Sequence, residues 1–221
     1  MSRRIHDLSL TNLGDLPPTC HACVFWEVAG APQGPRAGDE ETARGRKEAW
    51  WQATQLEWGT PGKALYVDDR PVGYATFAPA QHFPRARQLL ATVSDDALLL
   101  ATLWIAPDHR DSGAAKMLLQ SVLRETHRRG GKALEAFAAR DAGVGSRLMT
   151  CFIPEDFLLA NGFEVRTEHA EYPLLRLDLR KTVRWQESVG HALSGVITAL
   201  SRRERARAPA RPALEAAGRR R

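Results

Sequence analysis

Residues 103–119 read Leu-Trp-Ile-Ala-Pro-Asp-His-Arg-Asp-Ser-Gly-Ala-Ala-Lys-Met-Leu-Leu. An apolar run from Leu98 to Ala106 stops at Pro107, a short polar loop with one glycine follows, and a helical apolar pattern then begins. This order predicts a strand, a tight turn and a helix N-terminus. The first turn of a helix leaves four backbone N–H groups without partners and carries roughly half a positive charge. Its residues here are small enough for an anion to approach the backbone: Ser112, Gly113, Ala114 and Ala115. The stretch therefore predicts a phosphate or pyrophosphate site.

The loop differs from two other phosphate-binding motifs. It lacks the GK[ST] sequence of a Walker A loop and the three-glycine pattern of a dinucleotide-binding fold. An ordinary connection between a strand and a helix remains an alternative on this loop alone. The rest of the chain has to decide between the two.

The composition is that of a globular protein with one substantial domain. The chain has 221 residues, of which 43% are hydrophobic and 26% charged. Residues 180–221 carry 11 Lys and Arg against 3 acidic residues, whereas residues 1–179 carry 20 against 23. The body is therefore mildly acidic, which argues against nucleic-acid binding by the body, since that would need a basic face.

Targeting signals and disulfides are not expected. No apolar run approaches the ~20 residues that cross a bilayer, so no membrane partner is expected. After Arg3 and Arg4, polar and apolar residues alternate up to Asp15, so a signal peptide is not expected. An odd number of cysteines, three, is typical of a reducing cytoplasm.

Periodicity predicts alternating strands and helices along the body. The expected helices run from Asp39 to Trp58, from about Ser112 to Arg129 and from Ile153 to Ala160. In the first of these, Trp50, Trp51 and Leu56 should face the core; in the second, Glu125 should face water. The expected strands are Ile5–Leu10, Ala64–Val67, Pro71–Phe77, Leu98–Ile105, Ala133–Phe137, Phe163–Val165 and Leu174–Leu179. The strands around the second helix should be parallel, by the right-handed crossover rule.

Two motifs in this order resemble the GNAT (Gcn5-related N-acetyltransferase) family. Arg110-x-x-Gly113-x-Ala115 resembles its pyrophosphate signature Q/R-x-x-G-x-G/A, and residues 157–164, Phe-Leu-Leu-Ala-Asn-Gly-Phe-Glu, resemble its F-Y-x-x-x-G-F motif. The resemblance covers roughly residues 3–180. It implies an α/β (α+β mixed) fold with a central sheet of about six to seven strands flanked by helices, as an acyltransferase domain over residues 1–180.

The same resemblance implies acetyl-CoA, or a related acyl-CoA, as cosubstrate, with no metal. Carried over residue by residue, the backbone of Leu103, Trp104 and Ile105 would bind the pantetheine arm. The pyrophosphate would be wrapped by Arg110, Asp111, Ser112, Gly113, Ala114 and Ala115, with Lys116 close by. Backbone amides aimed at one dianion form a pre-organised nest, and Arg110 adds a charge-assisted contact.

Catalytic residues are harder to carry over. The family's tyrosine, four residues before the second motif's glycine, is replaced by Leu158, and residues 101–104 lack the glutamate that many relatives have. Glu135 on the adjacent strand and Glu27 after Phe25-Trp26 are the candidates for a catalytic role. The function implied is acetyl transfer from acetyl-CoA to an amine on a small molecule or a protein. The alternative is a non-catalytic acyl-CoA-binding sensor of the same fold.

Two further features stay open. Cys20-His21-Ala22-Cys23 is half of a tetrahedral zinc site, although thiols in a short helix are the simpler interpretation.

Residues 181–221 should form an amphipathic helix from about Val183 to Arg205 and then an Arg-rich, disordered tail. The helix should pack on its own body or on a second subunit, which would make a homodimer. A zinc- or nucleic-acid-linked regulator is a third function, which rests on these two features.

Overall fold

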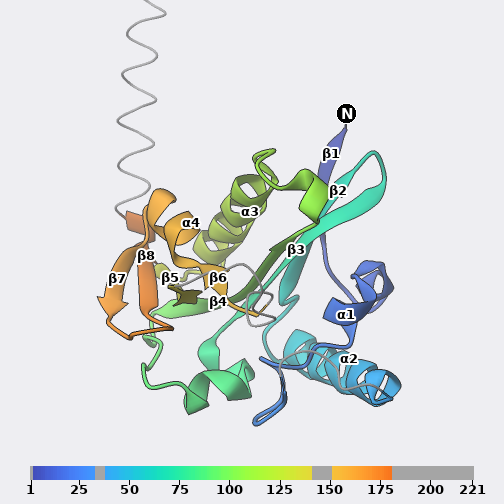
Figure 1. Ribbon diagram of the computed structural model, residues 1–221, viewed down its shortest axis with the longest axis horizontal. Helices are drawn as coiled ribbons and strands as arrows, with labels where there is room; N and C mark the ends of the chain where they lie inside the picture. The colour runs from blue at the N-terminus through green and yellow to red at the C-terminus, as the bar shows by residue number, and fades with distance from the viewer. Residues whose placement is uncertain (1, 33–37, 141–150, 181–221) are drawn as a thin grey trace, which may run out of the picture. The chain divides into compact units, whose positions relative to one another are not determined.

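The computed structural model describes residues 2–32, 38–140 and 151–180, and its compact unit spans Met1–Leu179 (Figure 1). The helices are α1 (Pro18–His21), α2 (Glu40–Glu57), α3 (Ala114–Arg128) and α4 (Glu155–Ala160). The strands are β1 (Arg3–Asp7), β2 (Gly62–Val67), β3 (Arg70–Ala78), β4 (Ala97–Ile105), β5 (Ala133–Ala139), β6 (Ile153–Pro154), β7 (Glu164–Thr167) and β8 (Leu174–Asp178). The expected helix at 183–205 lies outside the described residues.

One mixed sheet organises these elements. Its strand order is β1-β2-β3-β4-β5-β8-β7, and β6 pairs with β5. The pairs β1–β2, β2–β3 and β3–β4 are antiparallel, β4 and β5 are parallel as predicted, and β8 and β7 follow antiparallel. The sheet therefore has eight strands rather than six to seven, since the two-residue β6 has too little sequence to show periodicity.

Helices cover both faces of the sheet. Side chains alternate between the faces along a strand. On β2, Leu65 belongs to the cluster packed under α3, while its neighbour Ala64 packs against Trp51 of α2. Helices α3 and α2 therefore lie on opposite faces, and in Figure 1 α3 lies above the central strands and α2 lies below them.

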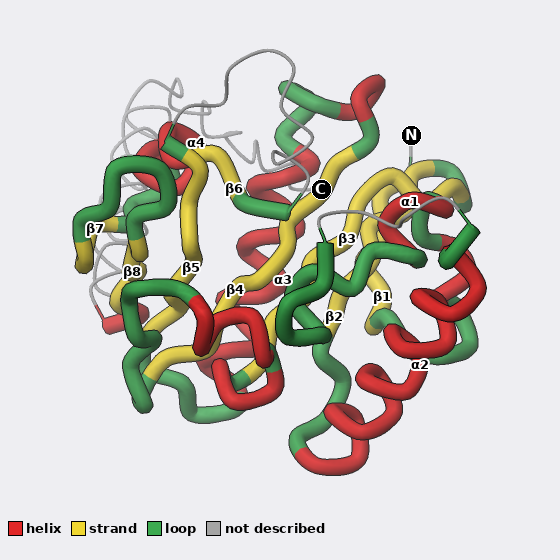
Figure 2. The backbone as a smooth tube through the Cα atoms, turned by 60° about the horizontal axis from the view of Figure 1, so that its bottom comes forward, coloured by secondary structure: helices red, strands yellow, loops and turns green. Residues whose placement is uncertain are grey.

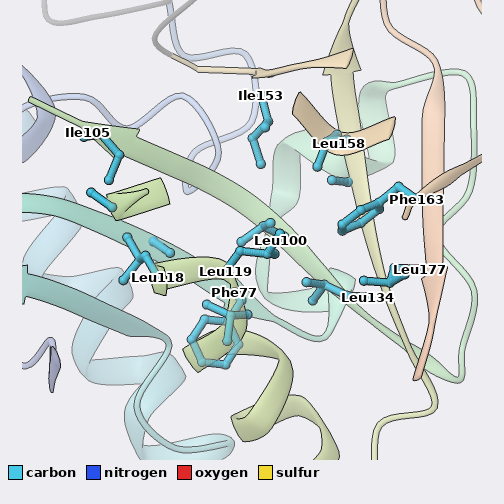
Figure 3. Packing of buried hydrophobic residues seen from close by; sticks show 14 of the residues in the cluster. Phe77, Leu100, Ile105, Leu118, Leu119, Leu134, Ile153, Leu158, Phe163 and Leu177 are labelled. Carbon is cyan, nitrogen blue, oxygen red and sulfur yellow. The ribbon is translucent and has the colours of Figure 1, made fainter. Parts of the chain in front are cut away.

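The main core lies between α3 and the sheet (Figure 3). Leu118 and Leu119, spaced to share one helical face with Val122, pack against Phe77, Leu100 and Leu134. These side chains are all 2% exposed or less. Burial of a leucine or phenylalanine of this kind contributes about 1.5–3 kcal/mol, so the strand–loop–helix unit is held firmly at the centre of the molecule.

Strands β4 and β5 diverge after a short paired stretch. Their register pairs Ala97 with Ala133 and ends at Leu99 opposite Glu135, although β4 continues to Ile105. The β3–β4 register shifts between Thr76 and Phe77, and such a bulge increases local twist. The C-terminal half of β4 thus leaves β5.

Strand β6 lies on the edge of β5 that β4 leaves. It pairs with β5 at Ala138 and Ala139, while β8 occupies the other edge of β5. Figure 2 shows β6 between β5 and β4 accordingly. The gap between β4 and β5 means the separation of their backbones past Leu99, with β6 on its β5 side.

Two side-chain orientations differ from those expected. Leu56 is 81% exposed, because it lies five positions after the buried Trp51 and thus about 140° around the helix. Glu125 is buried rather than turned to water. Lys63 on β2 and the arginines that follow Glu125 explain its burial, since they supply charges that a buried carboxylate needs.

Candidate functional site

The loop between β4 and α3 turns through two unusual backbone conformations. A single turn of 3-10 helix, Pro107–His109, follows β4. Asp111 then has φ +58° and Gly113 has φ +79°, in the left-handed region. The Ser112 hydroxyl donates to the His109 carbonyl oxygen at 2.6 Å, and Arg3 donates to the Ser112 carbonyl oxygen at 3.1 Å. The loop is thus fixed by its own contacts and by β1.

The first turn of α3 is open to a ligand. Gly113 is its N-cap, and no side-chain hydrogen bond caps the helix there. A Cβ added to Gly113 would meet nothing within 4 Å. Residues 110–113 and Lys116 are exposed, while Ala114 is buried and anchors the helix. Uncapped amides with the helix dipole and nearby cationic side chains are the features of an anion site.

The three β4 residues expected beside the pantetheine arm lie past the paired part of that strand. Leu103 and Trp104 are half-buried and Ile105 is buried. Their cross-strand partners on β3 are Ala75, Tyr74 and Gly73. Within the described ranges, no strand pairs with them on the side where β5 departs. Their backbone edge on that side therefore has hydrogen-bonding groups that a ligand could use.

Glu135 is a buried carboxylate whose hydrogen bonds and ion pairs connect neighbouring parts of the fold. Its side chain is fully buried and accepts hydrogen bonds from the Ser94 backbone N–H at 2.9 Å and the Ser94 hydroxyl at 2.7 Å. Arg176 donates to it at 2.9 Å, and Arg166 lies at 3.5 Å. Glu135 also stands opposite Leu99, in the paired stretch. Both of its oxygens are engaged outside the gap, which favours a role in holding the sheet together.

Glu27 is also buried, and it pairs with Lys47 of α2. Both side chains are less than 5% exposed. A buried ion pair of this kind fixes two segments relative to one another, because each charge needs the other. Glu27 therefore links the segment after α1 to α2.

Leu158 of α4, at the position of the family's tyrosine, lies in the core beside Ile153 and Phe163 (Figure 3). It is fully buried. No acid or base replaces the tyrosine at this position of α4.

A cluster of thiols and aromatic rings, not predicted from the sequence, lies on the face of the sheet opposite α3. The Sγ atoms of Cys23 and Cys151 lie 3.8 Å apart. Trp26 donates from Nε1 to the Cys151 carbonyl oxygen at 2.8 Å, and its ring packs edge-on against Phe152. Phe152 stacks on Tyr172, which borders a surface pocket of about 210 Å³. The Cys-x-Phe-Trp and Cys-Phe sequences were the available signals, but only the fold brings them together.

The thiols of the Cys-x-x-Cys motif have different environments. A hydrogen bond from Cys151 lowers the pKa of Cys23 to about 6, and the charge of Lys47 and the Phe25 backbone N–H act in the same direction against burial. Burial raises the pKa of Cys20, which is hydrogen-bonded to Tyr74. Among the residues that the structure describes, no group of three or more His, Cys, Asp or Glu side chains is placed to hold a metal ion.

The fold is similar to those of solved acetyltransferases. The paia N-acetyltransferase of Thermoplasma acidophilum, in complex with coenzyme A, is 16% identical over 80% of this chain and 99% of that one, with a TM-score of 0.52. A structure of yncA from Salmonella typhimurium with its cofactor acetyl-CoA is 17% identical over 81% and 95%, with a TM-score of 0.53. An N-acetyltransferase from Staphylococcus aureus Mu50 is 17% identical over 81% and 99%, with a TM-score of 0.52.

The sequence was also compared with curated proteins and with family models, and the described helices were checked for membrane spans. No curated protein sequence matches the chain. None of the described helices is long and apolar enough to cross a bilayer. The family model for the acetyltransferase (GNAT) family matches residues 25–149, which is more than half of the chain and includes the β4–α3 unit. The chain therefore belongs to the GNAT family of acetyltransferases.

Proposed function

We propose that this protein transfers an acetyl group, or a related acyl group, from acyl-CoA to an amine. The observation that carries the proposal is the uncapped first turn of α3, directly after a strand that leaves its parallel neighbour. Two solved structures of similar fold hold coenzyme A or acetyl-CoA. A diphosphate is the ligand chemistry that this helix N-terminus suits.

In this proposal the loop binds the diphosphate and β4 binds the arm. The backbone N–H groups of residues 112–116 would face the phosphates, and Arg110 and Lys116 would add charge. The open backbone edge of Leu103, Trp104 and Ile105 would hydrogen-bond the pantetheine arm in the gap. The thioester would thereby be fixed in the gap, near the C-terminal half of β4.

The chemical step needs an amine beside that thioester. The amine nitrogen forms a bond to the thioester carbonyl carbon, the C–S bond breaks, and a proton passes from the nitrogen to the thiolate. Because Glu27 and Glu135 are held in buried contacts, we assign neither a catalytic role. Alignment of the two reactants supplies the main rate enhancement, and such alignment can lower a barrier by about 7–11 kcal/mol.

Acceptor-dependent release of free thiol from acetyl-CoA tests the proposal. A panel of small primary amines and peptides with free N-termini should include acceptors that raise thiol release above the acceptor-free rate, with the acetylated amine found by mass spectrometry. Tight acetyl-CoA binding with no release across the panel would instead support the sensor.

A further inference from the structure

The fold brings the sulfur of Cys23 close to that of Cys151, and not to that of Cys20 in the same Cys-x-x-Cys motif. Cys23 follows α1, and Cys151 lies two residues before β6 in the chain. Their Sγ atoms are 3.8 Å apart, although the residues are 128 positions apart in sequence. A disulfide needs about 2.0 Å between sulfurs, so the two Sγ atoms must move closer together before the bond forms. Cys20 instead contacts the Tyr74 hydroxyl.

The two sulfurs lie in a firmly built part of the structure. Trp26, three residues after Cys23, donates to the Cys151 carbonyl oxygen. Phe25 packs edge-on against Phe152, the residue after Cys151, at 5.4 Å between ring centroids. These contacts hold the two backbone segments side by side, so the thiols face each other without a rearrangement of the fold.

We propose that Cys23 and Cys151 form a reversible intramolecular disulfide when the protein meets a peroxide. Cys23 is the attacking sulfur because it is half-buried, whereas Cys151 is only 3% exposed. Cys151 is then the resolving sulfur. The proposal does not depend on the acyl transfer proposed above.

The reaction balances with peroxide as the oxidant. The Cys23 thiolate bonds to one peroxide oxygen, the O–O bond breaks, and hydroxide leaves, so that Cys23 becomes a sulfenic acid. The sulfur of Cys151 then bonds to the Cys23 sulfur, the S–O bond breaks, and water leaves with the thiol proton. Two thiols are oxidised, one peroxide is reduced to water, and a dithiol reverses the change.

The surroundings of Cys23 favour the first step. Thiolates, not thiols, attack peroxides, and lowered pKa values together with nearby cations make a thiol reactive. Cys151, Lys47 and the Phe25 N–H all stabilise the Cys23 thiolate and lower the pKa of this thiol, against the opposing effects of burial and the Glu27 charge. Burial keeps the Cys20 thiol protonated.

Peroxide treatment of the whole protein tests this inference. We expect the intact mass to fall by about 2 Da as two thiols are lost, and a peptide map to show Cys23 linked to Cys151. Dithiothreitol should restore both thiols. The matched control Cys20→Ser should give the same linkage, because that sulfur takes no part.

Further variants separate the two roles. Cys151→Ser should leave a sulfenic acid on Cys23 that a dimedone probe labels, and Cys23→Ser should leave Cys151 unreacted under the same conditions. In the wild type, a link between Cys20 and Cys23, a link between two chains, stepwise oxygen addition to Cys23 without a cross-link, or no reaction would each overturn the proposal. The wild-type peptide map shows whether peroxide links Cys23 to Cys151, even if a variant fails to fold.

Discussion

Glu27 and Lys47 are each other's partners, and both are buried. Removal of one member leaves an uncompensated buried charge or an unfilled site, which costs about 3–5 kcal/mol. We expect Glu27→Leu and Lys47→Met each to lower the free energy of unfolding by about that amount. The double variant should lose less than the two single losses combined. Urea denaturation of the four proteins measures this coupling.

The same variants test whether Glu27 has a chemical role. A Glu27→Leu protein with unchanged urea midpoint but no acetyl transfer would show that Glu27 acts in catalysis, against the structural role assigned here. Loss of stability with turnover retained in the folded fraction would agree with it.

Glu125 should make stability depend on pH. A hydrogen bond from Arg128, together with Arg129 and the charge of Lys63, lowers the pKa of Glu125 to about 2 against the effect of burial. In the unfolded chain a glutamate has a pKa of about 4.3. The ionised form therefore stabilises the fold above about pH 4.3, and this contribution is lost as pH falls toward 2.

The Glu125→Gln variant measures that contribution. Because Arg128 is exposed, we expect a destabilisation of only about 1–2 kcal/mol at pH 7. The difference from wild type should shrink steadily below pH 4 in urea titrations. A difference that stays constant from pH 7 to pH 2.5 would contradict the assigned ion pairs.

Residue-level orientation was only partly predictable. Helical periodicity gave the angle of Glu125 on α3 but could not show Lys63, which reaches it from β2. Likewise, the Cys20-x-x-Cys23 spacing suggested half of a zinc site, whereas the sulfur that lies beside Cys23 belongs to Cys151, beyond β5 in the chain. Contacts between residues far apart in the chain determine the burial of Glu125 and the neighbour of Cys23, and a single sequence does not show such contacts directly.

At the scale of elements, strong periodicity and turn chemistry were sufficient. The strands Ala64–Val67 and Pro71–Phe77 were predicted, and Asp68 and Asp69, which lie in the turn between β2 and β3, adopt positive φ, +47° and +65°. Helix α3 and the parallel pairing of β4 with β5 were also predicted. Strand β6 was missed, because its two residues become a strand only through pairing with β5.

The close approach of β3 and β4 can be tested at Gly73. A Cβ there would stand 2.5 Å from Ile105 Cδ1 and 2.8 Å from the Trp104 carbonyl oxygen. Gly73→Ala should therefore push the strands apart, destabilise the protein by about 1–3 kcal/mol and weaken acetyl-CoA binding, measured by thermal denaturation and calorimetry. The control Gly14→Ala meets nothing within 4 Å and should behave as wild type. Wild-type behaviour of Gly73→Ala would contradict this β3–β4 geometry.

At the scale of the molecule, the fold was predicted from the order of the strands and helices, and the mildly acidic body from the distribution of charged residues. The strand–loop–helix unit and the Asn161-Gly162 sequence of the second motif were enough to show a resemblance to the family. The divergence of β4 from β5 depends on a bulge against β3 and on where pairing stops, which periodicity within one segment does not show. The proposed acyl-CoA site needs that divergence.

The central claim is that the first turn of α3 binds the diphosphate of acyl-CoA. Gly113→Glu places a bulky negative side chain at that turn, and Gly130→Glu is its matched control. Gly130 lies just beyond the other end of α3, has the same φ of +79° and also meets nothing within 4 Å. Both substitutions therefore carry the same backbone strain.

Isothermal titration calorimetry with acetyl-CoA compares the wild type and these two variants. We predict that Gly113→Glu weakens binding by at least about 100-fold, equivalent to roughly 2.7 kcal/mol, while Gly130→Glu binds like the wild type. Wild-type affinity in a folded Gly113→Glu protein would contradict the account.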